Sequence, residues 1–567
     1  MMMIGIDLGT SNSVVAYWKD GKVRIIPNAL GNSLTPSIVS VDENNEIFVG
    51  EVAKERMITH PEKTASLFKR TMGTDKKIRL GSAEYISEEL SSMILRKLKQ
   101  DAEAFLKEEV KEAVISVPAY FNDRQRKATK RAAEIAGLHV ERLISEPTAA
   151  ALSYGIHDRE SDVNFLVFDL GGGTYDVSIL EKFDEIIQVR AIAGDNYLGG
   201  TDFTTAIFEH FLIKNEMQQN TLTDKEKSIL FKLAEQAKYD LNAEGKTTIT
   251  FQKGDKQYSN TIDNSIFEEM TYSLIQRLRA PIVRALHDAS LRPDDLDAVI
   301  LVGGATRMPL IKSVVTKILG RIPYSEIDPD KSVALGTAIQ AALKQRDASI
   351  KETILTDVCP FTLGTDIVKD LGNQQFESGY FLPIIERNTP IPVSIEKRLY
   401  TVYDNQEKIV IDVYQGESRN TKDNLKIGEV TIAVPPAPAG EEMIDVRYTY
   451  DINGILEVEC TQVSSGMKET IVIEQNPGNL STEEIKNRLN ELASLKIHPR
   501  EKEENRLLIA RGERLYEETL GNLRNEVASL LENFDRVIET QRVDYISKAA
   551  KQLKQRLDQI EGWNSRL

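Results

Sequence analysis

The stretch Ile4–Ser13, IGIDLGTSNS, decides how the first half of this chain folds, because an apolar run ends in an Asp and small polar residues follow. The same pattern returns in Val167–Ser178, VFDLGGGTYDVS, where the acid is Asp169. Each stretch predicts a strand, a tight glycine turn and a second strand, which together make a β-hairpin. Such a turn exposes backbone N–H groups that suit phosphate oxygens, and the Asp beside them can hold a cation.

Either hairpin alone is explained as a structural turn in which the Asp caps the local backbone. Two such hairpins favour a duplicated fold whose halves face each other. They would hold one nucleotide tail, with Mg²⁺ between the phosphates and the carboxylates of Asp7 and Asp169. Other nucleotide motifs do not fit: Gly245-Lys246-Thr247 lacks the first glycine of a Walker A loop, and neither hairpin has Rossmann spacing.

A third stretch, Leu301–Pro309 (LVGGATRMP), predicts a strand, two glycines and a helix. Glycines there let a flat ring approach the backbone, and Arg307 could stack on that ring. Strand-Gly-Gly-helix junctions are common in α/β folds, so the position of this one after the second hairpin is what connects it to a nucleotide.

The composition is that of a soluble protein with several domains. The chain has 567 residues, of which 41% are hydrophobic and 28% charged. The net charge of −16 argues against binding to nucleic acid or to an anionic membrane, and no apolar run is long enough to predict a membrane span. Cys359 and Cys460 are too few for a disulfide framework, and no signal peptide is recognised, so we expect a cytoplasmic protein.

The sequence texture changes twice along the chain. Up to about Arg346, strand-like and helix-like runs alternate, which predicts an α/β region. From Cys359 to about Ile473 short alternating runs predict an all-β region. A capping box at Ser481–Glu484 then opens a stretch that predicts a helical bundle. The expected domains are 1–350, 359–477 and 478–567, with a linker at 351–358 that is most simply a flexible tether.

These motifs resemble, in their order, the seventy-kilodalton heat-shock chaperones of the DnaK type, from Ile4 to beyond Lys496. The stretches VISVPAYFNDRQRKAT, LISEPTAAALSYG, GDNYLGGTDF and IIERNTPIPV carry the resemblance further. The short C-terminal region, LFKRTMG and SLKIHPR are most similar to the bacterial HscC branch. The resemblance implies a multidomain fold with an actin-like α/β ATPase domain of two lobes, a β-sandwich that binds extended peptides, and a C-terminal α-helical lid.

The resemblance also implies an activity, which is hydrolysis of ATP to ADP and phosphate by in-line attack of water. ATP would speed peptide exchange and hydrolysis would lock the peptide in. The implied cofactors are ATP or ADP and Mg²⁺, with K⁺ as a further candidate. The implied partners are unfolded client segments and a J-domain cochaperone, and we expect a monomer that serves the stress response.

The implied site has three groups of residues. The phosphate loops are Gly9, Thr10, Ser11 and Asn12, and Gly171, Gly172, Gly173 and Thr174. The hydrolytic residues are Asp7, Lys69, Glu146, Asp169, Thr174 and Asp176, of which Asp7, Glu146 and Asp169 would hold Mg²⁺ largely through water. The nucleoside contacts are Gly199, Gly200, Glu235, Lys238, Asn242, Gly303, Gly304, Arg307 and Asp330. Without the resemblance, Lys69 would be a solvated lysine and Glu235 and Lys238 an exposed i,i+3 pair.

Two further groups are implied to couple the nucleotide to the peptide. The relay residues would be Pro118, Arg126, Ile354 and Leu355. In the peptide cleft, Val368 and Val402 would arch over the bound backbone, while Ile409 and Ile411 would line the apolar pocket. Core packing explains these apolar residues equally well, because any sandwich buries alternate residues.

The chain departs from the family at several points. Asn242 replaces the usual Ser, and Ile354-Leu355-Thr356 replaces a longer leucine-rich linker, so docking of the linker would be weaker or differently tuned. The stretch between Asp240 and Glu268 is shorter than in a typical DnaK, which argues against dependence on a nucleotide-exchange factor. We also expect no long C-terminal tail of the kind that many family members have.

Two rival functions remain open at this stage. A sugar kinase would share the duplicated hairpins but would lack the β-sandwich and the lid. A family member that only binds nucleotide could hold clients or promote exchange on another chaperone, without productive hydrolysis. Lys69, Asp169 and Thr174 argue against that second alternative.

Overall fold

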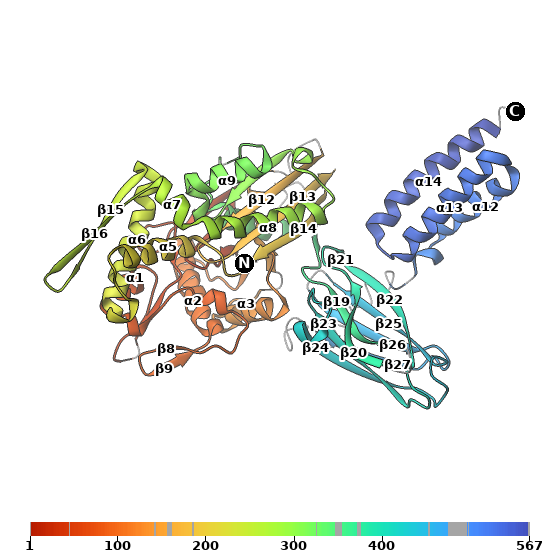
Figure 1. Ribbon diagram of the computed structural model, residues 1–567, viewed down its shortest axis with the longest axis horizontal. Coiled ribbons are helices and arrows are strands. Elements are labelled where there is room, and N and C mark those ends of the chain that lie inside the picture. The colour runs from red at the N-terminus through yellow and green to blue at the C-terminus, as the bar shows by residue number, and fades with distance from the viewer. Residues whose placement is uncertain are drawn as a thin grey trace. The chain divides into compact units, whose positions relative to one another are not determined.

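The computed structural model divides the chain into two compact units, Met1–Thr356 and Asp357–Leu567 (Figure 1). It describes residues 2–44, 46–140, 143–155, 162–183, 186–324, 326–345, 354–370, 376–451, 454–473, 496 and 498–564. The capping box predicted at Ser481–Glu484 and linker residues 351–353 lie outside the described residues.

The first unit contains two sheets with the same strand order. In the first sheet, a meander runs through β1 (Met3–Asp7), β2 (Asn12–Lys19) and β3 (Lys22–Ile26), and β10 (Glu112–Val117) lies parallel to β1. In the second, a meander runs through β12 (Val163–Leu170), β13 (Tyr175–Phe183) and β14 (Ile186–Asp195), and β17 (Ala298–Val302) lies parallel to β12. Both predicted hairpins and their duplication are therefore confirmed.

Two helices connect the sheets. Helix α10 (Ser332–Lys344) follows the second sheet in the chain but packs on β1, β2 and β10, while α4 (Glu146–Ser153) packs on α10 and β12. Their backbones approach so closely that a Cβ at Gly336 would lie 1.7 Å from the carbonyl oxygen of Ala149. Glycine is required there because any side chain would overlap the neighbouring backbone. This contact fixes how the two hairpins face each other.

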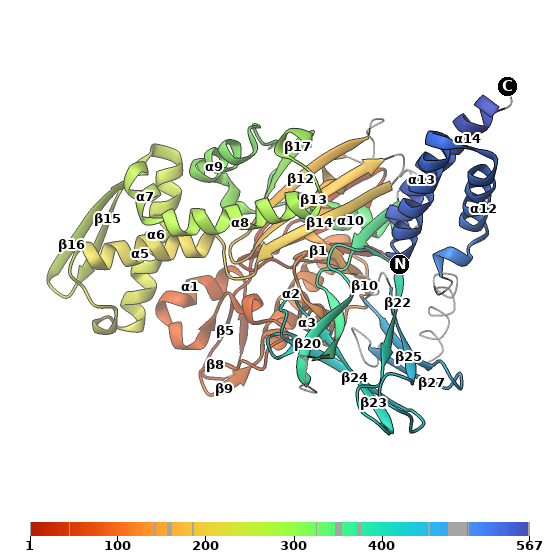
Figure 2. The same ribbon diagram turned by 45° about the vertical axis from the view of Figure 1, so that its right-hand side comes forward.

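The remaining helices of the first unit surround these sheets. On the first sheet, α2 (Ser87–Leu106) contacts β2 and β3 and packs against α3 (Asp123–Ile135). On the second sheet, α8 (Tyr272–Asp288) runs across β13 and β14 (Figure 2). Beyond the second sheet lie α5 (Gly200–Lys214), α6 (Asp224–Glu244), α7 (Asn264–Met270) and the hairpin of β15 (Lys246–Lys253) and β16 (Lys256–Asp263). The smaller α1 (Glu51–Thr59) contacts α6, and α9 (Pro309–Leu319) follows β17.

The apolar pair of the predicted linker belongs to a strand. The backbones of Ile354, Leu355 and Thr356, in β18 (Ile354–Val358), pair in parallel with residues 186–188 of β14. An edge strand presents unpaired N–H and C=O groups, and β14 offers such an edge here. At these three residues the linker is thus hydrogen-bonded, which the expectation of a flexible tether did not anticipate.

The second unit combines a β-sandwich with a helical bundle. One sheet contains β19 (Leu363–Asp370), β20 (Phe376–Ile385), β23 (Lys408–Gln415) and β24 (Leu425–Ala433). The other contains β22 (Val393–Tyr400), β25 (Met443–Tyr450), β26 (Leu456–Gln462) and β27 (Lys468–Ile473), and both sheets share one apolar core. Helices α12 (Glu503–Glu518), α13 (Gly521–Glu539) and α14 (Val543–Asn564) pack around a core that includes Phe534 (Figure 1). The predicted order of α/β, β and α regions is confirmed for the described residues.

Across the part of the chain that the structure describes, every helix is too short or too polar to span a bilayer.

The contact between Gly336 and Ala149 predicts a specific loss of stability. Gly336→Ala should lower the free energy of unfolding of the first unit by about 1–3 kcal/mol, because the new methyl group meets backbone that cannot move aside. Lys344→Ala, on the same helix, removes a loose ion pair with Glu112 on the exposed side and should change this free energy by less than about 0.5 kcal/mol. Urea unfolding of both variants measures this, and equal stabilities would contradict the account.

Candidate functional site

A cavity of about 1120 Å³ opens in the first unit where the two hairpins bend. From the first hairpin it is lined by Asp7 and by Gly9, Thr10, Ser11 and Asn12. From the second it is lined by Asp169, Gly171, Gly172 and Thr174. The turns also touch each other, since a Cβ at Gly172 would lie 1.9 Å from the Ser11 hydroxyl oxygen. The two turns therefore form one surface, as the duplicated pattern predicted.

Four carboxylates gather at one end of this cavity around a single ammonium group. Among the five side chains, Lys69, Glu146, Asp169 and Asp176 are buried, and the Lys69 Nζ lies 3.1 Å from the Glu146 Oε1. Asp7 accepts a hydrogen bond of 3.0 Å from the Ser116 hydroxyl. Burial of Lys69 contradicts the alternative of a solvated surface lysine.

Burial, together with this excess of negative charge, raises the pKa of three carboxyl groups. Desolvation and the charge of Glu146 raise the pKa of Asp7 to about 7 and that of Asp176 to about 8. The same causes raise the pKa of Asp169 well above its usual range. The Oδ1 of Asp176 is buried and accepts no hydrogen bond from any of the described residues. Among the described residues no three carboxylates are placed to ligate a metal ion directly, so Mg²⁺ would fit this cluster through its water ligands and would compensate the charge.

Lys69 is held between the carboxylates and a loop. It lies on a 3-10 turn (Phe68–Thr71), and its Nζ is 5.5 Å from the centre of the Phe121 ring. Arg126 donates to the carbonyls of Phe121 at 3.2 Å and Ala119 at 3.4 Å, and the buried Pro118 accepts the Phe121 N–H at 3.1 Å. The two predicted relay residues thus shape the loop that contacts Lys69.

The opposite side of the cavity is built from α6 and the Gly303-Gly304 turn. Glu235, Lys238 and Asn242 line it from α6, while Gly303, Gly304, Arg307 and Asp330 line it from the turn and from the chain before α10. The Arg307 guanidinium donates to Asp330 at 2.9 Å and pairs with Asp328. Its orientation is fixed by two carboxylates, so its flat face is available to a planar ring.

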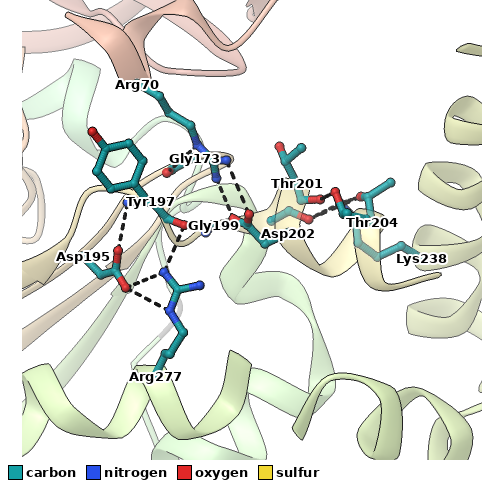
Figure 3. Close-up of polar contacts among 12 residues, drawn as sticks. Arg70, Gly173, Asp195, Tyr197, Gly199, Thr201, Asp202, Thr204, Lys238 and Arg277 are labelled. Atoms are coloured by element: carbon teal, nitrogen blue, oxygen red, sulfur yellow. Dashed lines mark hydrogen bonds and ion pairs between the residues drawn. The ribbon is translucent and has the colours of Figure 1, made fainter. Parts of the chain in front are cut away.

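Lys238 is also buried, which contradicts the alternative of an exposed pair with Glu235. Its Nζ donates to the carbonyl of Gly200 at 3.0 Å and to the hydroxyl of Thr204 at 2.8 Å (Figure 3). Desolvation lowers the pKa of Lys238. This residue therefore anchors the first turn of α5 as well as lining the cavity.

The comparisons with known proteins agree with this arrangement. The sequence model described as Hsp70 protein matches residues 3–80 and 74–566. The chaperone protein DnaK of Thermotoga neapolitana is 43% identical over 498 residues, which cover 85% of this chain and 82% of the relative. DnaK of Thermosipho melanesiensis is 42% identical over 496 residues, with the same coverage. The chain belongs to the Hsp70 family.

Not every predicted residue of this Hsp70 lines the cavity. Asp176, Gly173 and Gly199 lie behind its wall, and a Cβ at Gly199 would be 2.4 Å from the Gly173 nitrogen. Sequence reasoning missed Tyr239, which does line the cavity and is 55% exposed. It lies on the same helix as Glu235, Lys238 and Asn242, and this position in the sequence is the feature from which its place in the cavity could have been predicted.

The predicted peptide-cleft residues of this Hsp70 lie in the β-sandwich. Ile409 and Ile411 on β23 are 8% and 2% exposed and belong to the shared core. Val368 on β19 and Val402 after β22 are half-buried. The backbone N–H of Val402 donates to the Gln406 side chain at 2.9 Å, which orders its loop. A role of these four residues in peptide binding stays a prediction.

The raised pKa of Asp176 predicts how stability depends on pH without nucleotide or Mg²⁺. An Asp binds a proton near pH 3.8 when unfolded but near pH 8 in this fold, so its contribution is largest below about pH 4 and is lost as the pH rises toward 8. Asp176→Asn should therefore give a shallower fall in the free energy of unfolding between pH 5 and 8 than the unchanged protein.

A matched control is Asp255→Asn, at the exposed tip of the β15–β16 hairpin, which should leave the slope unchanged. Urea unfolding of the first unit in EDTA at several pH values gives the slopes. Equal slopes for Asp176→Asn and the unchanged protein would contradict the assignment of Asp176 as a buried carboxyl group that is protonated in the folded protein.

Proposed function

We propose that this Hsp70 is an ATP-dependent chaperone whose first unit hydrolyses ATP and whose β-sandwich binds extended apolar segments of unfolded proteins. ATP binding weakens the hold on the segment and hydrolysis strengthens it. The observation that carries the proposal is the cavity in which both hairpin turns meet three carboxylates and one buried lysine, with the fourth carboxylate, Asp176, directly behind the wall. The family match over nearly the whole chain connects that cavity to a chaperone.

The phosphate chain lies, in this proposal, between the two hairpin turns. Their N–H groups and the hydroxyls of Thr10, Ser11 and Thr174 donate to phosphate oxygens. Asp7, Asp169 and Glu146 hold Mg²⁺ largely through water, and the bound ion supplies charge neutralisation at the phosphates. K⁺ is a further candidate ion beside it.

Lys69 and the acids act on the reacting end of the nucleotide. Lys69 lines the cavity beside Glu146, where it stabilises charge on the γ-phosphate and orients the attacking water. The Thr174 hydroxyl lines the same wall and helps to position that water. Asp176 accepts hydrogen bonds from the backbone N–H groups of Ala119 and Tyr120, which belong to the loop of Pro118. Through these bonds a change of the bound nucleotide is transmitted to that loop.

The nucleoside lies toward α6. Arg307 stacks on the adenine, while Glu235 and Asn242 bind the ribose and the base edge. Gly303 and Gly304 line the cavity on this side, and Gly304 leaves room for the Asp330 carboxylate, since a Cβ there would be 2.5 Å from the Asp330 Oδ1. The domain is then an actin-like ATPase of two lobes.

Within the Hsp70 family, we assign the chain to the HscC branch. A J-domain cochaperone delivers its clients, and the protein works as a monomer. Independence of an exchange factor is supported by the β15–β16 hairpin, in which only Gly254 and Asp255 connect the strands. A long loop for such a factor is therefore missing at this hairpin. The cytoplasmic location stays a prediction.

The two rival functions are less well supported. A sugar kinase would not need the β-sandwich and the three-helix bundle of the second unit. A member that only binds nucleotide would not need a lysine buried among four carboxylates, because burying that charge is costly unless it is used.

Lys69→Ala tests the proposed hydrolysis. The kcat for ATP should fall by about 100-fold or more, because a buried charge at the reacting phosphate is lost, whereas the affinity for ADP should change by only a few-fold. Single-turnover hydrolysis and nucleotide titration measure the two quantities. Lys312→Ala, on the exposed side of α9, is the control and should leave both unchanged.

The same assay with an apolar peptide and a J-domain protein tests the coupling. Both should raise the turnover of the unchanged protein and of Lys312→Ala, but not that of Lys69→Ala. Turnover that ignores peptide and J-domain protein would contradict the chaperone mechanism, and equal kcat for Lys69→Ala would contradict the role of the lysine.

A further inference from the structure

Arg70 makes a contact that neither the sequence motifs nor the proposed mechanism uses. Its Nε donates to the carbonyl of Gly173 at 2.9 Å, and its Nη2 and Nη1 donate to the two carboxylate oxygens of Asp202 at 2.6 and 3.4 Å (Figure 3). The two side chains are 17% and 24% exposed. Arg70 lies between β7 (Thr64–Ala65) and β8 (Ile78–Leu80) in the first half of the unit, whereas both partners belong to the second half, so the contact crosses between the halves.

The carbonyl that Arg70 holds is the last of three in the second phosphate loop. The carbonyls of Gly171 and Gly172 accept the backbone N–H groups of Gly200 and Thr201, each at 2.9 Å, and the carbonyl of Gly173 accepts Arg70. In a trans peptide the C=O and the following N–H point in opposite directions. Holding three carbonyls therefore fixes the direction of the next three N–H groups, and Arg70 sets the last of these, at Thr174.

Asp202 joins this contact to the start of α5. Its Oδ2 accepts the N–H of Gly199 at 2.8 Å as well as the Arg70 guanidinium. Lys238 holds the same turn from the other side through Gly200. The first turn of α5, which supplies two of the three donors to the loop, is thus itself held in place by a carboxylate and an ammonium.

The loop leaves no room for this contact to shift. A Cβ at Gly173 would lie 2.8 Å from the Arg70 Nε and 2.5 Å from the Thr10 side chain. Arg70 also follows Lys69 directly on the same 3-10 turn. One backbone turn therefore carries both the buried ammonium and the group that fixes the opposite phosphate loop.

We propose that Arg70 is a positioning residue of the ATPase site, which orients the donors of the second phosphate loop toward the phosphate chain and ties that loop to Lys69. The inference rests on the proposed ATP hydrolysis. Arg70 does not line the cavity, so it acts through Gly173 and Asp202 and not by touching the nucleotide. Its loss should weaken the hold on phosphates and leave the nucleoside contacts intact.

Arg70→Ala gives a readout that general destabilisation would not produce. The affinity for ADP with Mg²⁺ and the single-turnover rate with ATP should each fall by about 10- to 100-fold, the effect expected for one charge-assisted contact. The affinity for adenosine, which has no phosphate, should stay within about two-fold. Arg70→Lys should recover only part of the loss, because an ammonium cannot reach carbonyl and carboxylate in the same fork geometry.

Arg277→Ala is a matched control in the same unit. Arg277 also binds one Asp and one carbonyl, with its Nη2 2.6 Å from the Asp195 Oδ2 and 3.1 Å from the Tyr197 oxygen (Figure 3). It does not contact the phosphate loop in any interaction found among the described residues, so all three measurements should stay within about two-fold of the unchanged protein.

The outcomes separate this inference from the proposed function. If the unchanged protein neither hydrolyses ATP nor binds ADP, the proposed function fails. If it does both and Arg70→Ala behaves like Arg277→Ala, or loses adenosine and ADP affinity equally, the positioning role is overturned. Selective loss of the phosphate-dependent quantities, with partial recovery in Arg70→Lys, supports it.

Discussion

The gathering of four carboxylates, three of them buried, around one buried ammonium group is the interaction on which the nucleotide unit depends. Asp7, Glu146, Asp169 and Asp176 reach this point from four different segments, and Lys69 is the only cation among the five side chains. Such a group is costly in an empty protein, as the raised pKa values of the three aspartates show. A divalent cation that binds together with a nucleotide would compensate the excess negative charge of this cluster and so offset the free-energy cost of gathering it.

The rest of the first unit can be understood as the means of bringing these groups together. Two sheets of the same strand order each deliver an Asp to the bend of a hairpin. Close backbone contact between α4 and α10 sets the sheets against each other, and small residues at Gly172 and Gly336 permit that approach. The second phosphate loop is then fixed from outside the cavity by α5 and Arg70. Outside the cavity, Asp176 contacts the Pro118 loop, and Ile354 and Leu355 pair with β14.

Local patterns predicted the elements of this site, and tertiary contacts decided the rest. The two hairpins and the Gly303-Gly304 turn followed from glycine spacing and apolar runs, which are local properties. The burial of Lys69 and Lys238 did not, because a lysine in isolation is most often solvated and only its neighbours far along the chain show otherwise. The pairing of the linker with β14 was unpredictable for the same reason. Arg70 and Asp202 were missed since they touch the backbone of the loop, and backbone contacts leave no motif of their own.

The central claim is that the two hairpin aspartates form a paired clamp for Mg²⁺ and nucleotide, and proton release on binding tests it most directly. Burial raises the pKa of Asp7 to about 7, so this carboxyl group is partly protonated at pH 7 and releases its proton when a divalent cation binds. Titration calorimetry of ADP with Mg²⁺ at pH 7, in buffers of different ionisation enthalpy, counts these protons. The account predicts net release that is smaller in Asp7→Asn. Binding with no exchange of protons, or with equal release in Asp7→Asn, would contradict it.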